Sequence, residues 1–372
     1  MSEAEGLLSG LRSRRMIKWR AYAGTDVIPA WVADMDLAVA PLVREAMGRA
    51  IAASDLGYPP EEHASGLADV FAARAERRWG WKPDPSLTHS LPYVARGLVN
   101  AVEAFTLPGD RVVVQTPIYP PFLSIAADLG RIVVPSPFGD PLPQEGARIV
   151  MLCNPHNPLG RAMTREELIE IAEWAERHDA VIVSDEIHGD LVYTPNRHIP
   201  IASLGDDVAA RTVTLVAASK AFNLAGMRCA IAASGSRALH ERLMALGPYT
   251  RDGVSTLGIV ATEAAWSLEG DEWLDGTIAL LQRNRDWLCE QLANRLPVIR
   301  STPPEATYLA WLDCRGLGLD DPTRHFLERA GVALSNGRGF GPEGEGHVRL
   351  NFATYPAVLA EIVDRMEASL TL

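Results

Sequence analysis

The middle of the chain alternates between short apolar runs and longer segments in which apolar residues recur at every third or fourth position. Short apolar runs bounded by polar residues are typical of buried strands, and we expect strands at residues 111–115, 131–134, 147–152, 180–184 and 212–218. Residues 164–179 begin with a threonine, carry acidic residues in the first turn and then follow helical spacing, so they predict an amphipathic helix capped by Thr164. Short buried strands separated by helices predict an α/β fold, in which a mostly parallel sheet is sandwiched by helices.

The pattern changes near residue 270. A long helix is predicted at residues 273–296, and after it we expect a strand at 308–313, a helix near 322–330 and a strand at 349–353. We therefore expect a small α+β domain over residues 266–372, to which an N-terminal segment, residues 1–40, contributes. A large domain is expected over residues 41–265. Proline and glycine are frequent in residues 135–146, which predicts a surface loop.

Composition and charge narrow the class of protein. The chain has 372 residues, 47% of them apolar, which is enough for a full-sized core. A net charge of −12 and the lack of a basic stripe argue against a nucleic-acid partner. One basic cluster alternates with apolar residues and is interpreted as a solvated helix face or a subunit contact; it consists of Arg12, Arg14, Arg15, Lys18 and Arg20.

The four cysteines are scattered without metal-ligand spacing. We therefore expect reduced thiols in a cytoplasmic protein and no metal site. Neither a signal peptide nor a run of about 18 apolar residues is visible, which argues against secretion and against a membrane partner.

Three polar residues each follow an apolar run, and they are Asn157, Asp185 and Lys220. In sheets of this type, ligands bind beyond the carboxyl ends of the strands. A lysine at the end of a buried strand is unfavourable unless it has a partner or a covalent role, such as a Schiff base with a carbonyl compound. Taken alone, however, a lysine at such a position is more often simply exposed.

The neighbouring polar residues complete a set of chemical functions. A buried Asp185 needs a cationic partner, and a protonated pyridine nitrogen would serve. Asn157 offers an amide to a phenolic oxygen, while Ser219 and Arg228 offer donors to a phosphate. These are the requirements of pyridoxal 5′-phosphate (PLP). Singly, Asp185 could be a helix cap, Asn157 part of a turn and Arg228 a surface ion-pair partner, but their joint occurrence favours the cofactor.

Several motifs resemble the class I/II aminotransferase superfamily of fold type I, PLP-dependent transferases: Asn-Pro-His-Asn-Pro-Leu-Gly (154–160), Ser-Asp-Glu-Ile-His-Gly-Asp-Leu (184–191) and Ser-Lys-Ala-Phe-Asn-Leu-Ala-Gly-Met-Arg (219–228). The segments Trp-Val-Ala-Asp-Met-Asp (31–36), Ala-Thr-Tyr-Leu-Ala-Trp-Leu-Asp (306–313) and Val-Arg-Leu-Asn-Phe-Ala-Thr (348–354) resemble the cystathionine β-lyase subgroup of MalY/PatB type, which are carbon–sulfur lyases. The resemblance extends from about residue 15 to the C-terminus.

The resemblance implies roles for the residues around the cofactor. Lys220 would hold PLP and move the proton, and Asp185 would pair with the ring nitrogen. Asn157 would bond the phenolic oxygen, beside His188, which stands where aminotransferases usually have a tyrosine. Tyr119 would stack on the ring, although ordinary turn packing is the alternative.

Further roles concern the phosphate and the substrate. The phosphate would be held by Ser219, Arg228 and the backbone amides of Ala95 and Arg96, at the start of a helix expected over residues 94–105. Tyr58 resembles a tyrosine that a neighbouring subunit lends to the phosphate, which implies a homodimer. Arg349 would bind the α-carboxylate of an amino-acid substrate. Trp31 and Tyr308 are interpreted as core aromatics that could also line the pocket.

The chain departs from the family pattern around the phosphate. Tyr93 stands where the family usually has a glycine, Arg96 lies inside the phosphate loop, and Ala217 replaces a serine of many relatives. The phosphate site is therefore expected to differ in detail, and the substrate need not be cystathionine.

The resemblance implies β-elimination from an S-substituted cysteine, which yields a thiol, pyruvate and ammonia. An aminotransferase is the alternative, because the same residues would support transamination if the proton returned to the cofactor instead. A protein whose main task is to bind a regulator is a third possibility, which the complete set of Lys220, Asp185 and Arg228 makes less favourable.

Overall fold

The computed structural model describes residues 3–59, 66–251 and 253–371, and its largest feature is a seven-stranded sheet. The strand order is β2-β8-β7-β6-β5-β3-β4. Strand β8 pairs antiparallel with both of its neighbours, whereas all other pairs are parallel, so the expected mostly parallel sheet is confirmed. The strands are β2 (Thr88–Leu91), β3 (Arg111–Thr116), β4 (Ile132–Pro137), β5 (Ile149–Cys153), β6 (Val181–Asp185), β7 (Thr212–Val216) and β8 (Ala230–Ser234).

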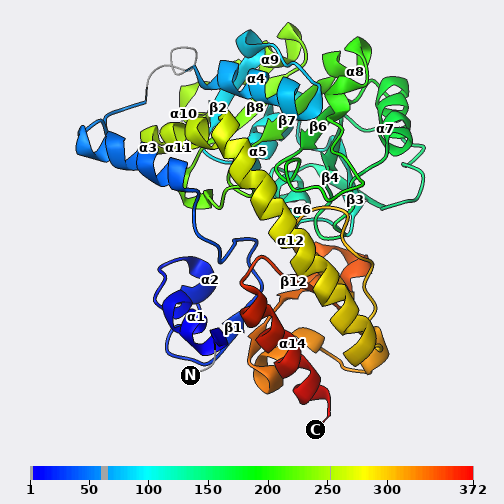
Figure 1. Cartoon of the computed structure of the whole chain (residues 1–372). Coiled ribbons are helices and arrows are strands. Elements are labelled where there is room, and N and C mark those ends of the chain that lie inside the picture. Colours follow the sequence, from blue (N-terminus) through cyan, green and yellow to red (C-terminus); the bar gives the residue numbers. More distant parts are fainter. Residues whose placement is uncertain (1–2, 60–65, 252, 372) are drawn as a thin grey trace.

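Helices cover both faces of this sheet, as Figure 1 shows. Alternate residues of β5 face opposite cores: Met151 packs toward one set of helices and Val150 toward the other. The first core is formed with α5 (Val94–Phe105), α6 (Pro121–Asp128) and α9 (Arg237–Met244). The opposite face is covered by α7 (Arg165–Arg177), α4 (Leu67–Trp79) and α11 (Thr256–Ala265).

Helix α7 begins where the sequence predicts. The Thr164 side chain accepts a hydrogen bond from the Glu167 backbone N–H at 3.2 Å, and the Thr164 N–H donates to the Glu167 carboxylate at 2.7 Å. This reciprocal pair satisfies N–H groups that the first turn of a helix leaves free.

A second group of elements lies below the large sheet in Figure 1. It contains an antiparallel sheet of order β11-β12-β9, formed by β11 (Ser335–Asn336), β12 (His347–Asn351) and β9 (Leu309–Asp313). The N-terminal segment joins this group: β1 (Ile28–Pro29) pairs with β10 (Val332–Ala333), and α1 (Glu3–Arg12) packs on α14 (Pro356–Leu370). We retain the division into residues 1–40, 41–265 and 266–372 as a proposal.

Helix α12 (Leu268–Arg295) runs between the two groups, with its N-terminal end beside the large sheet (Figure 1). The other α-helices of the described residues are α2 (Ile17–Arg20), α3 (Pro41–Ala52), α8 (Asp206–Ala210), α10 (Pro248–Arg251) and α13 (Pro322–His325). No helix within the described ranges is both long and apolar enough to span a membrane.

Strands β2 and β8 lie where the sequence predicts no strand, and three expectations differ from the structure. The segment 135–146 is not wholly a loop, because β4 extends to Pro137. Strand β4 lies at the edge of the sheet, where a proline is tolerated because there is no further strand among the described residues to which its missing N–H would donate. The helix near 322–330 is short and continues as a π-helical turn, Phe326–Ala330. Lys18 does not lie on a solvated face: it is buried and its Nζ lies 2.8 Å from the Asp36 carboxylate.

Candidate active site

A cavity of about 670 Å³ lies at the carboxyl ends of β5, β6 and β7 and reaches β12 of the smaller group. Most of the predicted residues line it, from both groups of elements. They are Ala95, Tyr119, Asn157, Asp185, His188, Ser219, Lys220, Arg228 and Arg349. Two predicted residues, Arg96 and Tyr58, are not among those that line the cavity.

Lys220 lies in the turn after β7, where its half-buried side chain reaches into the cavity. Its Nζ donates a hydrogen bond to the Ala33 carbonyl at 2.7 Å. Burial lowers the pKa of Lys220, and the positive charge of Arg349 acts in the same direction against the opposing charges of Asp34 and Asp185. A lowered pKa increases the fraction of neutral, nucleophilic amine.

Asp185 is the last residue of β6, and its side chain is buried. One carboxylate oxygen accepts a hydrogen bond from the Ile187 backbone N–H at 3.0 Å. Burial raises the pKa of Asp185 to about 7, because the N–H bond and the charge of Lys220 only partly offset the loss of hydration. A cationic ring nitrogen placed against this carboxylate would supply the charge partner that burial demands.

Arg349, from β12 of the smaller group of elements, is buried and lines the cavity. Its guanidinium donates to the Asn157 side-chain oxygen at 2.9 Å, to the Trp31 carbonyl at 2.9 Å and to the Ser335 hydroxyl at 3.2 Å. Burial lowers the pKa of Arg349 to about 10. Among the described residues no carboxylate pairs with this guanidinium, so it is suited to an incoming carboxylate.

Asn157 and Tyr119 lie together between Arg349 and the end of β5. The Tyr119 backbone N–H donates to the Asn157 carbonyl at 3.0 Å, which holds the two loops side by side. Because Arg349 uses the side-chain oxygen of Asn157, the amide nitrogen is the part that remains for a ligand oxygen. The predicted stacking of Tyr119 and the predicted amide bond of Asn157 stay predictions.

His188 is buried in the turn after β6. Its ring packs edge to face with that of Tyr308, and the two ring centroids lie 6.1 Å apart. Burial lowers its pKa to about 3, and the charges of Lys220 and Arg349 add to the effect. His188 is therefore a neutral group in this cavity, which can accept or donate a hydrogen bond but adds no charge.

The start of α5 forms the far end of the cavity. The first N–H groups of a helix are free to bind an anion, and Ala95 lies in this first turn. Ser219 and Arg228 also line the cavity, and the Arg228 guanidinium lies 4.9 Å from the ring of Tyr93, the residue before this helix. Arg96 fits less well, because its backbone N–H donates to the Tyr93 carbonyl at 3.0 Å.

Tyr58 lies on the surface before α4 and is fully exposed in the single chain. Its segment rests against the start of α11, where the Thr256 hydroxyl donates to the Gly57 carbonyl at 2.6 Å. Its predicted contribution to a neighbouring subunit stays a prediction.

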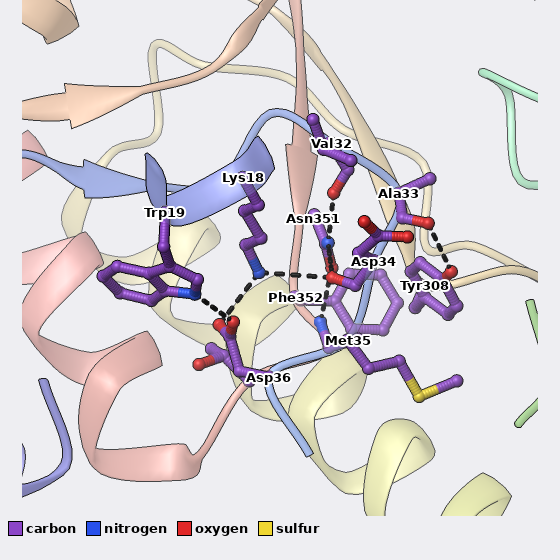
Figure 2. A network of polar contacts seen from close by, with 12 residues as sticks. Lys18, Trp19, Val32, Ala33, Asp34, Met35, Asp36, Tyr308, Asn351 and Phe352 are labelled. Carbon is purple, nitrogen blue, oxygen red and sulfur yellow. Dashed lines mark hydrogen bonds and ion pairs between the residues drawn. The ribbon is translucent and has the colours of Figure 1, made fainter. Parts of the chain in front are cut away.

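The segment 31–36 has a structural role that its sequence pattern does not predict. Figure 2 shows its carbonyl groups held by side chains from elsewhere in the chain. The Ala33 carbonyl accepts from the Tyr308 hydroxyl at 2.9 Å as well as from Lys220. The Asn351 amide donates to the Val32 carbonyl at 2.6 Å and to the Asp34 carbonyl at 2.7 Å.

The end of this segment is anchored by a buried ion pair. The Asp36 carboxylate accepts from Lys18 at 2.8 Å and from the Trp19 indole N–H at 2.7 Å (Figure 2). The only local signal for such a role is that two acidic residues stand within an apolar stretch without a helical or strand period. The segment thus forms one wall of the cavity, with Trp31, Val32 and Ala33 lining it.

Lys220 and the buried Asp185 lie at the carboxyl edge of the mostly parallel sheet, and the Arg349 guanidinium, which pairs with no carboxylate of the described residues, lines the same cavity from β12. Residues 94–366 match the family model for aminotransferase class I and II, and the chain belongs to this family.

Individual relatives are similar over nearly their whole length. Cystathionine beta-lyase of Corynebacterium glutamicum is 37% identical, covering 98% of this chain and 99% of the relative. Cystathionine beta-lyase PatB of Bacillus subtilis is 35% identical, covering 95% and 96%. The structure of a Corynebacterium diphtheriae protein assigned as a PLP-dependent β-cystathionase superposes with a TM-score of 0.93 at 36% identity, covering 98% of each chain.

Proposed function

We propose that the chain is a PLP-dependent carbon–sulfur β-lyase that cleaves cystathionine or a related S-substituted cysteine to a thiol, pyruvate and ammonia. The observation that carries the proposal is one cavity that holds the amine of Lys220, the buried carboxylate of Asp185 and the guanidinium of Arg349. Support comes from the relatives named cystathionine beta-lyase at 37% and 35% identity.

The residues present fit PLP. Lys220 would carry the covalent attachment, and the buried Asp185 would face the ring nitrogen. Asn157 and His188 would lie near the phenolic oxygen and Tyr119 near the ring face. The phosphate would be held by Ser219, Arg228 and the first N–H groups of α5, at Ala95 and Arg96. The Arg96 N–H would have to give up its hydrogen bond to the Tyr93 carbonyl. When bound, the cofactor supplies an electron sink for the bond broken at the substrate Cα.

The protein's own groups perform the remaining tasks. Arg349 would bind the α-carboxylate through two parallel N–H groups, which orients the Cα–H bond. Lys220, once free of its covalent attachment, would take the Cα proton, and its lowered pKa favours the neutral amine that a general base requires. The Cα–H and Cβ–S bonds then break, the sulfur leaves as a thiolate, and the released aminoacrylate is hydrolysed to pyruvate and ammonia.

The proposal includes the assembly and the compartment. We propose a homodimer in which Tyr58 reaches the phosphate of the neighbouring subunit; its full exposure supports this, as does that of Tyr249, which is 95% exposed. We also propose a cytoplasmic location, which is supported by free cysteines at Cys153, Cys229, Cys289 and Cys314.

A panel of S-substituted cysteines, incubated with and without keto acids, tests the proposal. A lyase releases pyruvate from the cysteine derivatives without any keto acid. Formation of a new amino acid from the keto acid, without pyruvate release, would instead support the aminotransferase alternative, which the family membership keeps open.

A further inference from the structure

Arg228 lines the cavity and forms no ion pair with a carboxylate of the described residues. It follows the short 3₁₀ turn Ala225–Met227 and adopts a left-handed backbone conformation, with φ of 54° and ψ of 59°. Its carbonyl is held by the Ser255 backbone N–H at 3.3 Å. Residues other than glycine rarely adopt this backbone conformation. The surrounding structure must therefore hold it, and it sets the direction in which the Arg228 side chain points.

The side chain of Arg228 contacts an aromatic ring. Its guanidinium carbon lies 4.9 Å from the centre of the Tyr93 ring, which is within the range of a cation–π contact. No carboxylate of the described residues forms an ion pair with it. A cation–π contact does not occupy the guanidinium N–H groups as an ion pair would, so they remain able to donate to a phosphate oxygen.

Tyr93 is placed where it can direct this cation. It is the N-cap residue of α5, but its side chain makes no capping hydrogen bond. Its carbonyl accepts the Arg96 N–H, which fixes the backbone, and its ring lines the cavity beside Ala95. The same residue therefore begins the helix whose N–H groups face the cavity and contacts the arginine at that end.

We propose that Tyr93 is a positioning residue for the phosphate of the cofactor: its ring holds the Arg228 guanidinium beside the N-terminus of α5. A free arginine side chain samples many rotamers, and ordering it opposes binding. The ring restricts those rotamers before the phosphate arrives and adds no charge that would compete for it. This inference rests on the proposed function, since it assumes that Arg228 faces the phosphate.

Binding to the full-length apoprotein separates this role from simple packing. The ligands are PLP and pyridoxal, which share the ring and aldehyde and differ in the phosphate. Tyr93→Leu keeps an apolar side chain without a π face, and Tyr93→Phe keeps the ring. We expect Tyr93→Leu to weaken PLP binding about fivefold, which corresponds to about 1 kcal/mol, and to leave pyridoxal binding within about twofold. Tyr93→Phe should bind PLP about as tightly as the wild-type protein does.

A second pair of variants tests the route through Arg228. Arg228→Ala should weaken PLP but not pyridoxal, and adding Tyr93→Leu to it should cause no further loss of PLP affinity. Equal weakening of both ligands by Tyr93→Leu, or no weakening of PLP, would overturn the proposal, as would a full Tyr93→Leu effect in the Arg228→Ala background. Pyruvate release by the wild-type enzyme is measured separately, so a failure of the lyase function is distinguishable from a failure of this inference.

Discussion

Burial acts on the ionisable groups of the cavity in opposite directions. It raises the pKa of Asp185 to about 7 and lowers that of Arg349 to about 10, in each case favouring the neutral form. A bound cation beside the Asp185 carboxylate and a bound anion beside the Arg349 guanidinium would reverse both pKa shifts. The site is therefore adapted to a cation beside Asp185 and an anion beside Arg349.

The raised pKa of Asp185 makes the stability of the apoprotein depend on pH. The folded chain binds this proton more tightly than the unfolded chain, so the stabilisation is present at low pH and is lost as the pH rises toward about 7. We expect wild-type apoprotein to lose stability relative to Asp185→Asn between about pH 4 and 7, with a constant difference above. Denaturant unfolding at several pH values measures this; a difference independent of pH would contradict it. Saturation with PLP should remove the dependence.

Arg349 gives a prediction about geometry. Arg349→Lys keeps a positive charge but loses the planar pair of N–H groups, so kcat/KM should fall roughly 30- to 100-fold, or about 2–3 kcal/mol. Arg324→Lys is the matched control, because Arg324 is exposed and pairs with Glu328 on the surface. Steady-state kinetics on both variants decide the matter, and equal small effects would show that Arg349 does not bind the carboxylate.

At the scale of elements, the segment 31–36 is held by residues distant in sequence. Lys18→Met should lower the free energy of unfolding by about 3–5 kcal/mol, because it leaves the buried Asp36 without its cation. Arg12→Met is a suitable control: Arg12 pairs with Asp26 on the surface, where loss of the pair changes stability by less than about 1 kcal/mol. Similar unfolding midpoints for the two variants in denaturant would rule out the anchoring role.

Strands β3 to β7 of the large sheet could be predicted because their signals are local, whereas β2 and β8 were not predicted. Apolar runs mark the buried strands. The start of α7 is marked by Thr164 and Glu167, which stand only three residues apart. The placement of Asp185 and Lys220 at one cavity could be predicted because each stands within two residues of the end of such a run. The contacts of Lys18 and Asn351 could not be predicted, because they join side chains to partners that the fold alone brings together.

At the scale of the whole molecule, the proposed homodimer makes a prediction about mixed subunits. If Tyr58 acts across the interface, a hybrid of Tyr58→Ala and Lys220→Ala chains contains one site with both native residues. Mixing two poorly active proteins should then restore activity, up to about half that of the native dimer for each hybrid. Activity after mixing and refolding is the measurement, and no gain despite hybrid formation would place Tyr58 in its own subunit's site or in none.

The most direct test of the account is the fate of the sulfur when an S-substituted cysteine is supplied alone. We predict equal amounts of thiol and pyruvate from the wild-type enzyme loaded with PLP. The Lys220→Ala protein should give neither, because it lacks the amine that takes the Cα proton. A keto acid that still carries the sulfur substituent, in place of free thiol, would contradict the lyase assignment and establish transamination instead.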